Sequence, residues 1–168
     1  MPKLPRATVY DASLGARAPY IYGILVKLEH ADILYIGQTF SRFGAIGRLA
    51  QHLSDTSAAT LCRRVEALLD VVELAGIEVE FAAVRLGNQT GFWKQEPDYR
   101  EAVEATVQHE LLNELAIRGA RIGIVSRVQP NAYCQLKYVQ DEAARTTQSL
   151  LEWISNTRPT SDSAAASG

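Results

Sequence analysis

Two apolar segments separated by a short turn constrain the fold of this chain more than any other feature. Residues 20–28 (YIYGILVKL) and 33–38 (ILYIGQ) are rich in β-branched and aromatic residues, and residues 29–32 (EHAD) separate them. This pattern predicts an antiparallel hairpin. If the four intervening residues form the turn, Leu28 lies opposite Ile33.

In the same register Val26 lies opposite Tyr35. Side chains alternate between the two faces of a strand, so Tyr22 and Tyr35 are expected on one face, with Gly37 beside them. A glycine next to two phenols suggests a place where another group approaches the sheet closely. The hairpin therefore predicts a polar site on one face of a sheet.

The rest of the chain predicts helices and one further strand around this hairpin. The spacing of apolar residues predicts helices over 45–54, 58–75, 97–118 and 137–155, and alternation predicts a strand over 77–86. Residues 121–128 (RIGIVSRV) predict a short strand or an extended segment. We expect an α/β (α+β) fold with a small central three-stranded antiparallel sheet flanked by helices, and an extra C-terminal helix.

The chain has 168 residues and is 47% hydrophobic, which suits one domain with its own core. We expect an irregular N-terminal arm over 1–18, a single domain over 19–155 and a disordered, small and polar tail over 156–168. The sequence has no apolar run near the ~20 residues of a membrane span and no signal-peptide pattern. Cys62 and Cys134 lack metal or redox spacing, so we expect plain thiols and a cytoplasmic location.

The net charge of −2 does not by itself indicate a nucleic-acid-binding protein. Such a protein must then concentrate its cations locally, because neutralisation of phosphates dominates its affinity. Residues 42–64 contain four arginines and one acidic residue, Asp55. Scattered surface arginines are the alternative interpretation. Lys94 follows Phe92 and Trp93, a pair that either stacks on a base or packs onto the core.

Three groups of residues resemble the signature of the GIY-YIG nuclease family. They are Tyr20-Ile21-Tyr22, then Tyr35-Ile36-Gly37-Gln38-Thr39, then Arg48 and His52 in GRLAQHL. Tyr20 stands where the family usually has its first glycine, and the two tyrosines are further apart than in most members. The odd separation of Tyr22 and Tyr35 is compatible with one face, whereas aligning Gly23-Ile24-Leu25 instead supplies no phenol.

The resemblance implies a divalent-metal-dependent endonuclease that hydrolyses phosphodiester bonds, with DNA as the expected substrate. It implies that one helical glutamate binds a single Mg²⁺ or Mn²⁺, and Glu104 fits this position. Glu101 and Glu110 are rival ligands, and a solvated acidic flank is the structural alternative. A carboxylate completed by water and phosphate oxygens suits either cation.

The resemblance also assigns roles to the other residues. Tyr22 is the general base or positions the water, and Tyr35 orients the water or the phosphate. Arg48 holds the scissile phosphate, and His52, four residues later on the same helix face, carries a proton or orients its neighbours. Asn131 follows Pro130 and steadies the site, or else is an ordinary turn residue.

The partner is then expected to be double-stranded DNA, with a homodimer or another protein assisting target recognition. The residues expected to contact the nucleic acid are Gln38, Thr39, Arg42, Arg63, Arg64 and Lys94. Two other functions remain open at this point. One is a non-catalytic nucleic-acid-binding or assembly module that keeps the GIY-YIG fold. The other is a small-molecule or protein-interaction domain whose tyrosines only pack.

Overall fold

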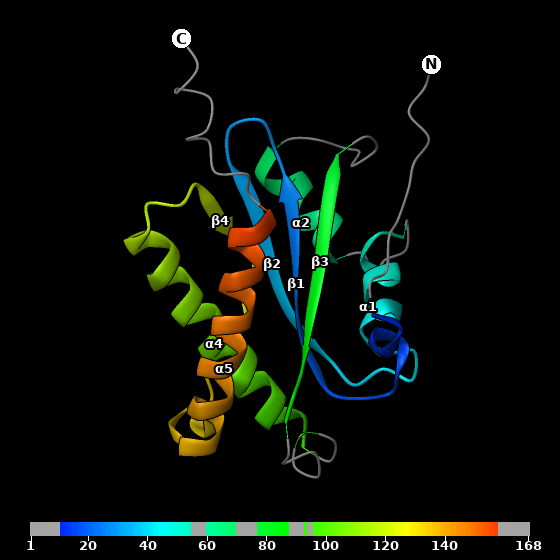
Figure 1. Cartoon of the computed structure of the whole chain (residues 1–168), viewed down its shortest axis with the longest axis vertical. Coiled ribbons are helices and arrows are strands. Elements are labelled where there is room, and N and C mark those ends of the chain that lie inside the picture. Colours follow the sequence, from blue (N-terminus) through cyan, green and yellow to red (C-terminus); the bar gives the residue numbers. More distant parts are fainter. Residues whose placement is uncertain (1–10, 55–59, 70–76, 88–92, 94–95, 158–168) are drawn as a thin grey trace.

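A four-stranded sheet lies at the centre of the computed structural model, which describes residues 11–54, 60–69, 77–87, 93 and 96–157 (Figure 1). The strands are arranged in the order β3-β1-β2-β4. Their bounds are Tyr20–Lys27 for β1, Asp32–Thr39 for β2, Glu78–Arg85 for β3 and Ile122–Ile124 for β4. The helices are η1 (Ala12–Gly15), α1 (Gly44–His52), α2 (Thr60–Leu69), α4 (Pro97–Ile117), η2 (Ala132–Gln135) and α5 (Lys137–Thr157).

The mixed α/β class is confirmed, whereas the predicted three-stranded antiparallel sheet is matched only in part, because the sheet has four strands and is mixed. The antiparallel strands β3, β1 and β2 are present, and β4 adds a fourth strand that runs parallel to β2. Only three residues of the apolar run 121–128 form this strand, opposite the start of β2. A pairing so short and so distant in sequence leaves no periodic pattern, so the sequence could not assign the run to a partner.

The predicted hairpin is confirmed, but its register differs by two residues. The observed partners across β1 and β2 are Tyr22 and Gly37, Ile24 and Tyr35, and Val26 and Ile33. The backbone N–H of Leu28 donates to the Asp32 carboxylate at 3.4 Å, so Leu28 belongs to the turn and not to the ladder. A shift of two residues preserves the faces of a strand. Tyr22 and Tyr35 therefore still share one face, as predicted.

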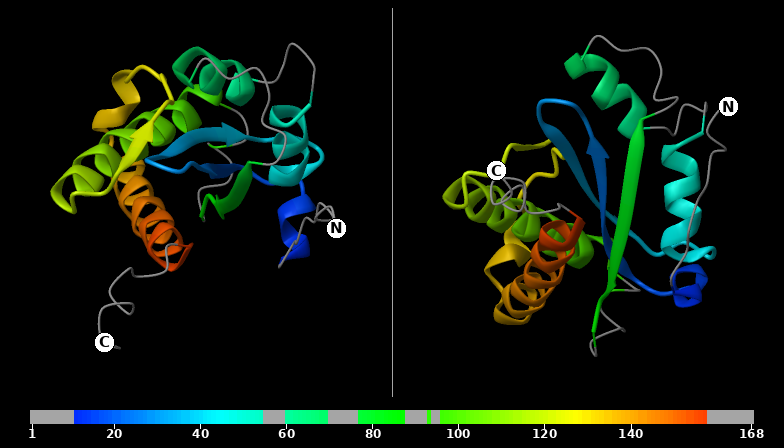
Figure 2. Two further views of the ribbon diagram at one scale, coloured as in Figure 1. Left: turned by 90° about the horizontal axis from the view of Figure 1, so that it is seen from above. Right: turned by 45° about the horizontal axis from the view of Figure 1, so that its top comes forward.

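Helices cover both faces of the sheet (Figure 2). On one face, α4 and α5 pack against Ile21, Leu25, Leu34 and Ile36. On the other face, α1 and α2 pack against a cluster that contains both tyrosines: Tyr22, Ile24, Val26, Ile33 and Tyr35. The two tyrosines therefore lie in the layer between the sheet and the two shorter helices.

The ends of the chain differ in part from the prediction. Residues 12–15 form η1, so the arm is not irregular there, and α5 continues through Asn156 to Thr157. The additional C-terminal helix is confirmed. Residues 1–10 and 158–168 lie outside the described residues, as do the ends of the helix predicted over 58–75.

Trp93 is 1% exposed and packs into the core, and Lys94 lies outside the described residues. None of the helices in the described ranges is both long and apolar enough to cross a lipid bilayer.

Candidate active site

The hydroxyl group of Tyr22 is the centre of a buried polar cluster. It lies 2.8 Å from His52 Nε2, and Arg48 Nε donates to it at 3.3 Å. Tyr22 is 1% exposed and His52 is fully buried. Residues four apart share a helix face, so α1 presents Arg48 and His52 to β1 together. The structure thus joins three of the residues that the sequence singled out.

The protonation of this cluster follows in part from its donors. An arginine nitrogen can only donate, so the Tyr22 oxygen accepts from Arg48. Burial, followed by the charges of Arg48 and Arg64, lowers the pKa of His52 to about 4, so its imidazole is neutral at neutral pH. In the tautomer with the proton on Nδ1, His52 Nε2 accepts the hydrogen bond of the Tyr22 hydroxyl group.

Gly37 makes room for the Tyr22 ring. It lies opposite Tyr22 in the ladder, and a Cβ at this position would collide with the Tyr22 hydroxyl group. The sequence suggested a close approach to the sheet at this glycine. The approaching group is the phenol ring of Tyr22 itself, which crosses from β1 over the backbone of β2.

Tyr35 and Arg64 form the second half of the cluster. The rings of Tyr22 and Tyr35 stack with their centroids 6.3 Å apart. The His52 and Tyr35 rings meet edge to face, with their centroids 4.8 Å apart. The guanidinium of Arg64, on α2, lies 5.3 Å from the centre of the Tyr35 ring. Its Nη1 donates to the Val125 carbonyl at 2.8 Å. Arg64 therefore belongs to this site, whereas the sequence placed it only among surface contacts to nucleic acid.

Glu104, on α4, interacts electrostatically with the same cluster. Burial, with help from Glu101, raises the pKa of Glu104 to about 7, while Arg64 and Arg48 act in the opposite direction. Glu104 likewise acts on the pKa of Tyr22 and of Tyr35. Within the described chain, Glu104 has neither an ion pair nor a hydrogen bond. It is thus a partly buried carboxylate that no neighbouring cation neutralises.

The phenols respond to the same neighbours. Burial raises the pKa of Tyr22. The neighbouring Tyr35 and Glu104 raise the pKa of Tyr22 further, whereas Arg48 lowers it. Burial likewise raises the pKa of Tyr35, against the effect of Arg64. Both phenols are therefore protonated at neutral pH. Deprotonation of either one requires added positive charge or a proton acceptor in contact, and Tyr22 has such an acceptor in His52.

The donor set fits a single hard cation. Among the described residues, no group of three or more His, Cys, Asp or Glu side chains is placed to share a metal ion. A lone carboxylate supplemented by water and phosphate is an acceptable shell for Mg²⁺ or Mn²⁺. Such a cation would favour the ionised form of Glu104 and so compensate for its burial. Glu104 is therefore the described residue that would hold such a cation at this cluster.

Of the other residues predicted to contact nucleic acid, some are exposed and some are held by contacts within the protein. Arg63 is exposed on α2, and Arg42 is exposed with its guanidinium 4.4 Å from the centre of the Phe43 ring. Thr39 is 7% exposed, and its hydroxyl accepts the backbone N–H of Ser41 at 3.1 Å. Gln38 accepts a hydrogen bond from Arg100 Nε at 2.9 Å. Thr39 thus stabilises a turn, and Gln38 is engaged by a neighbouring helix.

Asn131 is occupied by local structure. Its side-chain oxygen accepts the backbone N–H of Tyr133 at 3.0 Å and so caps η2. Its amide nitrogen donates to the carbonyl of Asp98, in the first turn of α4, at 2.9 Å. Among the described contacts, none joins Asn131 to Tyr22, Arg48 or Glu104. These local contacts agree with the alternative of an ordinary turn residue for Asn131.

Ser126 is a residue of the site region that the sequence analysis missed. Its hydroxyl accepts the backbone N–H of Ile36 and donates to the carbonyl of the same residue at 2.8 Å. It thereby extends the pairing between β4 and β2 toward Gly37. The available indication was a buried serine within the apolar run 121–128, but nothing in the sequence identified its partner.

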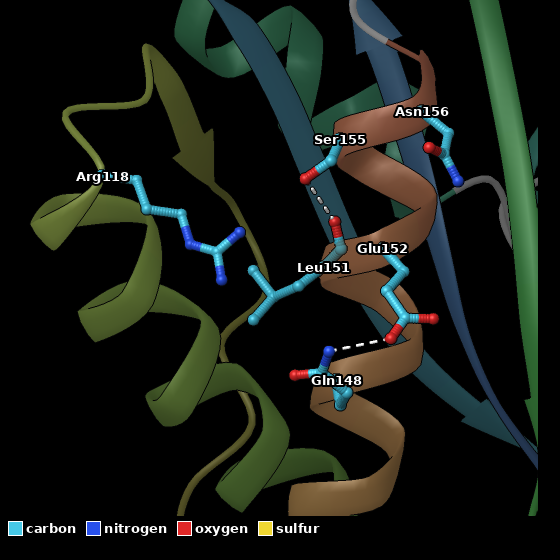
Figure 3. A pocket seen from close by; sticks show the side chains of 6 residues that line it. All are labelled: Arg118, Gln148, Leu151, Glu152, Ser155 and Asn156. Atoms are coloured by element: carbon cyan, nitrogen blue, oxygen red, sulfur yellow. Dashed lines mark hydrogen bonds between the residues drawn. The ribbon is translucent and has the colours of Figure 1, made fainter.

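A shallow hollow between α4 and α5 contains none of the predicted site residues. Figure 3 shows Arg118, which directly follows α4, facing Gln148, Leu151, Glu152, Ser155 and Asn156 on α5. Its accessible volume is about 370 Å³, and its polar side chains bond mainly within their own helices. The buried polar cluster around Tyr22, on the other face of the sheet, is therefore the candidate active site.

Comparison of the chain with protein-family models, with curated proteins and with solved structures gave no match.

Proposed function

We propose that this protein is a divalent-metal-dependent endonuclease that hydrolyses phosphodiester bonds, with DNA as its substrate. One observation carries the proposal. The Tyr22 oxygen is fixed between Arg48 and His52, and the Glu104 carboxylate lies close enough to influence the pKa of both phenols. Phosphodiester hydrolysis requires a proton acceptor, a positive charge for the phosphate and a carboxylate that can bind a metal ion. His52, Arg48 and Glu104 are the residues suited to these three roles.

Two arginines are available for the phosphate. Arg48 uses Nε for Tyr22 and Nη1 for Gln51, at 2.8 Å, and its Nη2 has no hydrogen-bond partner in the described chain. Arg64 uses Nη1 for the Val125 carbonyl. The free guanidinium nitrogens can donate to the non-bridging oxygens of a phosphate and stabilise the charge that builds up there.

The hydrogen bond between Tyr22 and His52 supplies a route for the proton of the attacking water. As the water oxygen bonds to phosphorus, its proton passes to the Tyr22 oxygen, and the Tyr22 proton passes to His52 Nε2. The bond from phosphorus to the leaving oxygen breaks with its electron pair on that oxygen, which takes a proton from solvent. The low pKa of His52 keeps its imidazole neutral, so Nε2 has a lone pair for the proton, and the weak basicity of the ring favours prompt release of that proton to solvent.

Glu104 would hold the cation, for which its unpartnered carboxylate is suited. A bound Mg²⁺ or Mn²⁺ supplies positive charge over the non-bridging oxygens and makes the attacking water more acidic. The chain itself positions Tyr22 and Arg48 and, by burying both phenols, limits the access of bulk water to the proton route.

Cleavage of supercoiled plasmid in the presence of Mg²⁺ or Mn²⁺ tests the proposal. We expect the wild-type protein to produce relaxed or linear plasmid, and Glu104→Gln and Arg48→Ala to lose this activity by at least about a hundredfold. Glu101→Gln is the matched control, because Glu101 is exposed one turn earlier on the same helix. It should retain activity.

Equal activity of all four proteins rejects the site. Tight DNA binding without cleavage at any metal concentration rejects the hydrolytic function and supports the non-catalytic binding module. Loss of activity in Glu101→Gln, with activity retained in Glu104→Gln, transfers the metal ligand to the neighbouring turn.

A further inference from the structure

Arg100 is a buried cation without a carboxylate partner. It lies on the second turn of α4 and is 8% exposed. Nε donates to the Gln38 side chain, and Nη1 donates to the backbone carbonyl of Trp93. No ion pair joins it to any carboxylate of the described residues. Burial lowers its pKa from the ordinary value of 12.5, and Glu101 opposes this effect.

Such a group is costly for a folded protein to maintain. Buried charges are normally paired, since two neutral hydrogen-bond acceptors do not replace a counterion. Nη2 of Arg100 makes no hydrogen bond within the described residues. The combination of burial, positive charge and a free donor indicates a site that an anion completes.

A second cation contacts the same aromatic ring as Arg100. The guanidinium carbon of Arg17 lies 5.0 Å from the centre of the Phe40 ring, and that of Arg100 lies 5.8 Å from it. Arg17 is exposed and, within the described chain, also forms no ion pair. We call Arg17, Phe40 and Arg100 the arginine–phenylalanine cluster. Its two cations share one aromatic ring and no counterion.

Close packing holds the backbone around this cluster in position. η1 lies beside the first turn of α1 (Figure 1). Gly44 has φ +64°, and a Cβ there would collide with the carbonyl oxygens of Leu14 and Ala16. Only a glycine allows this approach, and it fixes the segment that leads to Arg17 against the loop that carries Phe40.

The cluster lies next to the candidate active site. Arg100 precedes Glu104 by four residues, so the two share a face of α4 and are separated by about 6 Å along its axis. Gln38, which Arg100 contacts, follows Gly37, the glycine beneath the Tyr22 ring. One nucleic-acid strand carries a phosphate every ~3.4 Å of rise. The separation therefore corresponds to one or two nucleotide steps.

We propose that Arg17 and Arg100 together bind one backbone phosphate of the DNA strand, one or two nucleotides from the phosphate that Arg48 and Glu104 engage. This inference rests on the proposed function for the identity of the ligand. The cluster would set the direction in which the strand crosses the site. It would also let the enzyme bind DNA with a contact that takes no part in the reaction.

The salt dependence of DNA binding tests this proposal without knowledge of the target sequence. Binding to a random-sequence duplex is measured with Ca²⁺ over a range of salt concentrations for the wild type and three variants. Arg17→Ala changes an exposed side chain and leaves the fold intact. Arg100→Gln keeps hydrogen-bonding capacity toward its neighbours and loses the charge. Arg118→Ala, at the far end of α4, is the matched control.

We expect Arg17→Ala and Arg100→Gln each to weaken binding about tenfold. Each variant should also show a shallower slope when the logarithm of the DNA association constant is plotted against the logarithm of the salt concentration. The slope should change by up to about 0.9, the contribution of one phosphate. The double variant should show about the same slope as the single variants, because both arginines serve one phosphate. Arg118→Ala should match the wild type, and thermal unfolding should show that Arg100→Gln is folded.

The outcomes separate this inference from the proposed function. If the wild type binds and cleaves DNA and the variants show the same salt slope as the wild type, the phosphate site alone is overturned. Slope losses that add to about 1.8 in the double variant overturn the shared phosphate. Slope losses as expected in a protein that never cleaves support the phosphate site and reject the nuclease. A wild-type protein that does not bind DNA even at low salt overturns both.

Discussion

Glu104→Gln should stabilise the protein in the absence of metal while removing its activity. The carboxyl of Glu104 has a pKa of about 7 in the folded chain against an ordinary value of 4.5. Each pKa unit corresponds to about 1.36 kcal/mol, so ionised Glu104 costs the folded state about 3 kcal/mol. Glutamine has the same shape without the charge and avoids this cost.

The sign of the effect depends on pH. Below pH 4.5 the carboxyl is protonated in both the folded and the unfolded chain, and the two proteins should be equally stable. As the pH rises, the unfolded chain releases the proton first, so the wild type loses stability relative to Glu104→Gln. The difference should reach its maximum of about 3 kcal/mol above pH 7. For a chain of this length that corresponds to roughly 6–12 °C in Tm.

Thermal unfolding at pH 4 and pH 8, with and without Mn²⁺, measures these differences. Mn²⁺ should raise the Tm of the wild type at pH 8 and leave Glu104→Gln unchanged, because only the carboxylate binds the cation. Below pH 7 protons compete for the ligand, so the Mn²⁺ effect should fall as pH falls. Glu101→Gln should change stability by less than about 1 kcal/mol and keep the Mn²⁺ effect. A Glu104→Gln protein no more stable than wild type at pH 8 would refute the assignment of a buried, uncompensated carboxylate.

Three other substitutions examine the geometry around the site. Tyr22→Phe should reduce single-turnover cleavage by about 10²–10⁴-fold while DNA affinity measured by gel shift stays within about threefold; unchanged cleavage excludes the phenol from the proton route. Gly37→Ala should lower the free energy of unfolding in urea by about 1–3 kcal/mol, because its Cβ displaces the Tyr22 ring, whereas Gly123→Ala, in open surroundings, should be neutral. Equal effects of the two glycine changes contradict this explanation. Ser126→Ala should cost about 1–3 kcal/mol in the same assay by leaving two buried peptide groups of β2 unpaired, and Ser126→Thr, which keeps the hydroxyl, should cost less.

The hairpin shows why some features of this site could be predicted from the sequence. The face on which Tyr22 and Tyr35 lie depends only on whether their separation through the turn is odd or even. A register error of two residues therefore did no harm. The register itself depends on how many residues form the turn, and Leu28, whose N–H donates to the Asp32 side chain, belongs to the turn although its apolar side chain suggests the strand. The face could be predicted from periodicity, and the register could not.

Helix α4 shows the opposite case. The apolar stripe of this helix predicts that Glu104, next to Val103, lies at the edge of the buried face, and Glu104 is partly buried; the same pattern gives no reason for the burial of Arg100, which is 8% exposed. The helix packs against the sheet, α5 and η2, so few of its faces remain for water. Glu104 was proposed from the family resemblance, whereas Arg100 had no motif to indicate it. Burial of a charge depends on which elements surround a helix, and its own sequence does not encode them.

The contact between Ser126 and Ile36 has a consequence for the order in which the molecule is made. The two residues are 90 positions apart, and Val125, which accepts a hydrogen bond from Arg64, precedes the serine. A ribosome that has released only β1, β2 and α1 has already supplied Tyr22, Arg48 and His52. It has not yet supplied Glu104 or the segment that secures the second strand. A nascent or prematurely terminated chain thus carries the phenols and the imidazole without the carboxylate, and the complete constellation forms only after the polypeptide has emerged as far as Ser126.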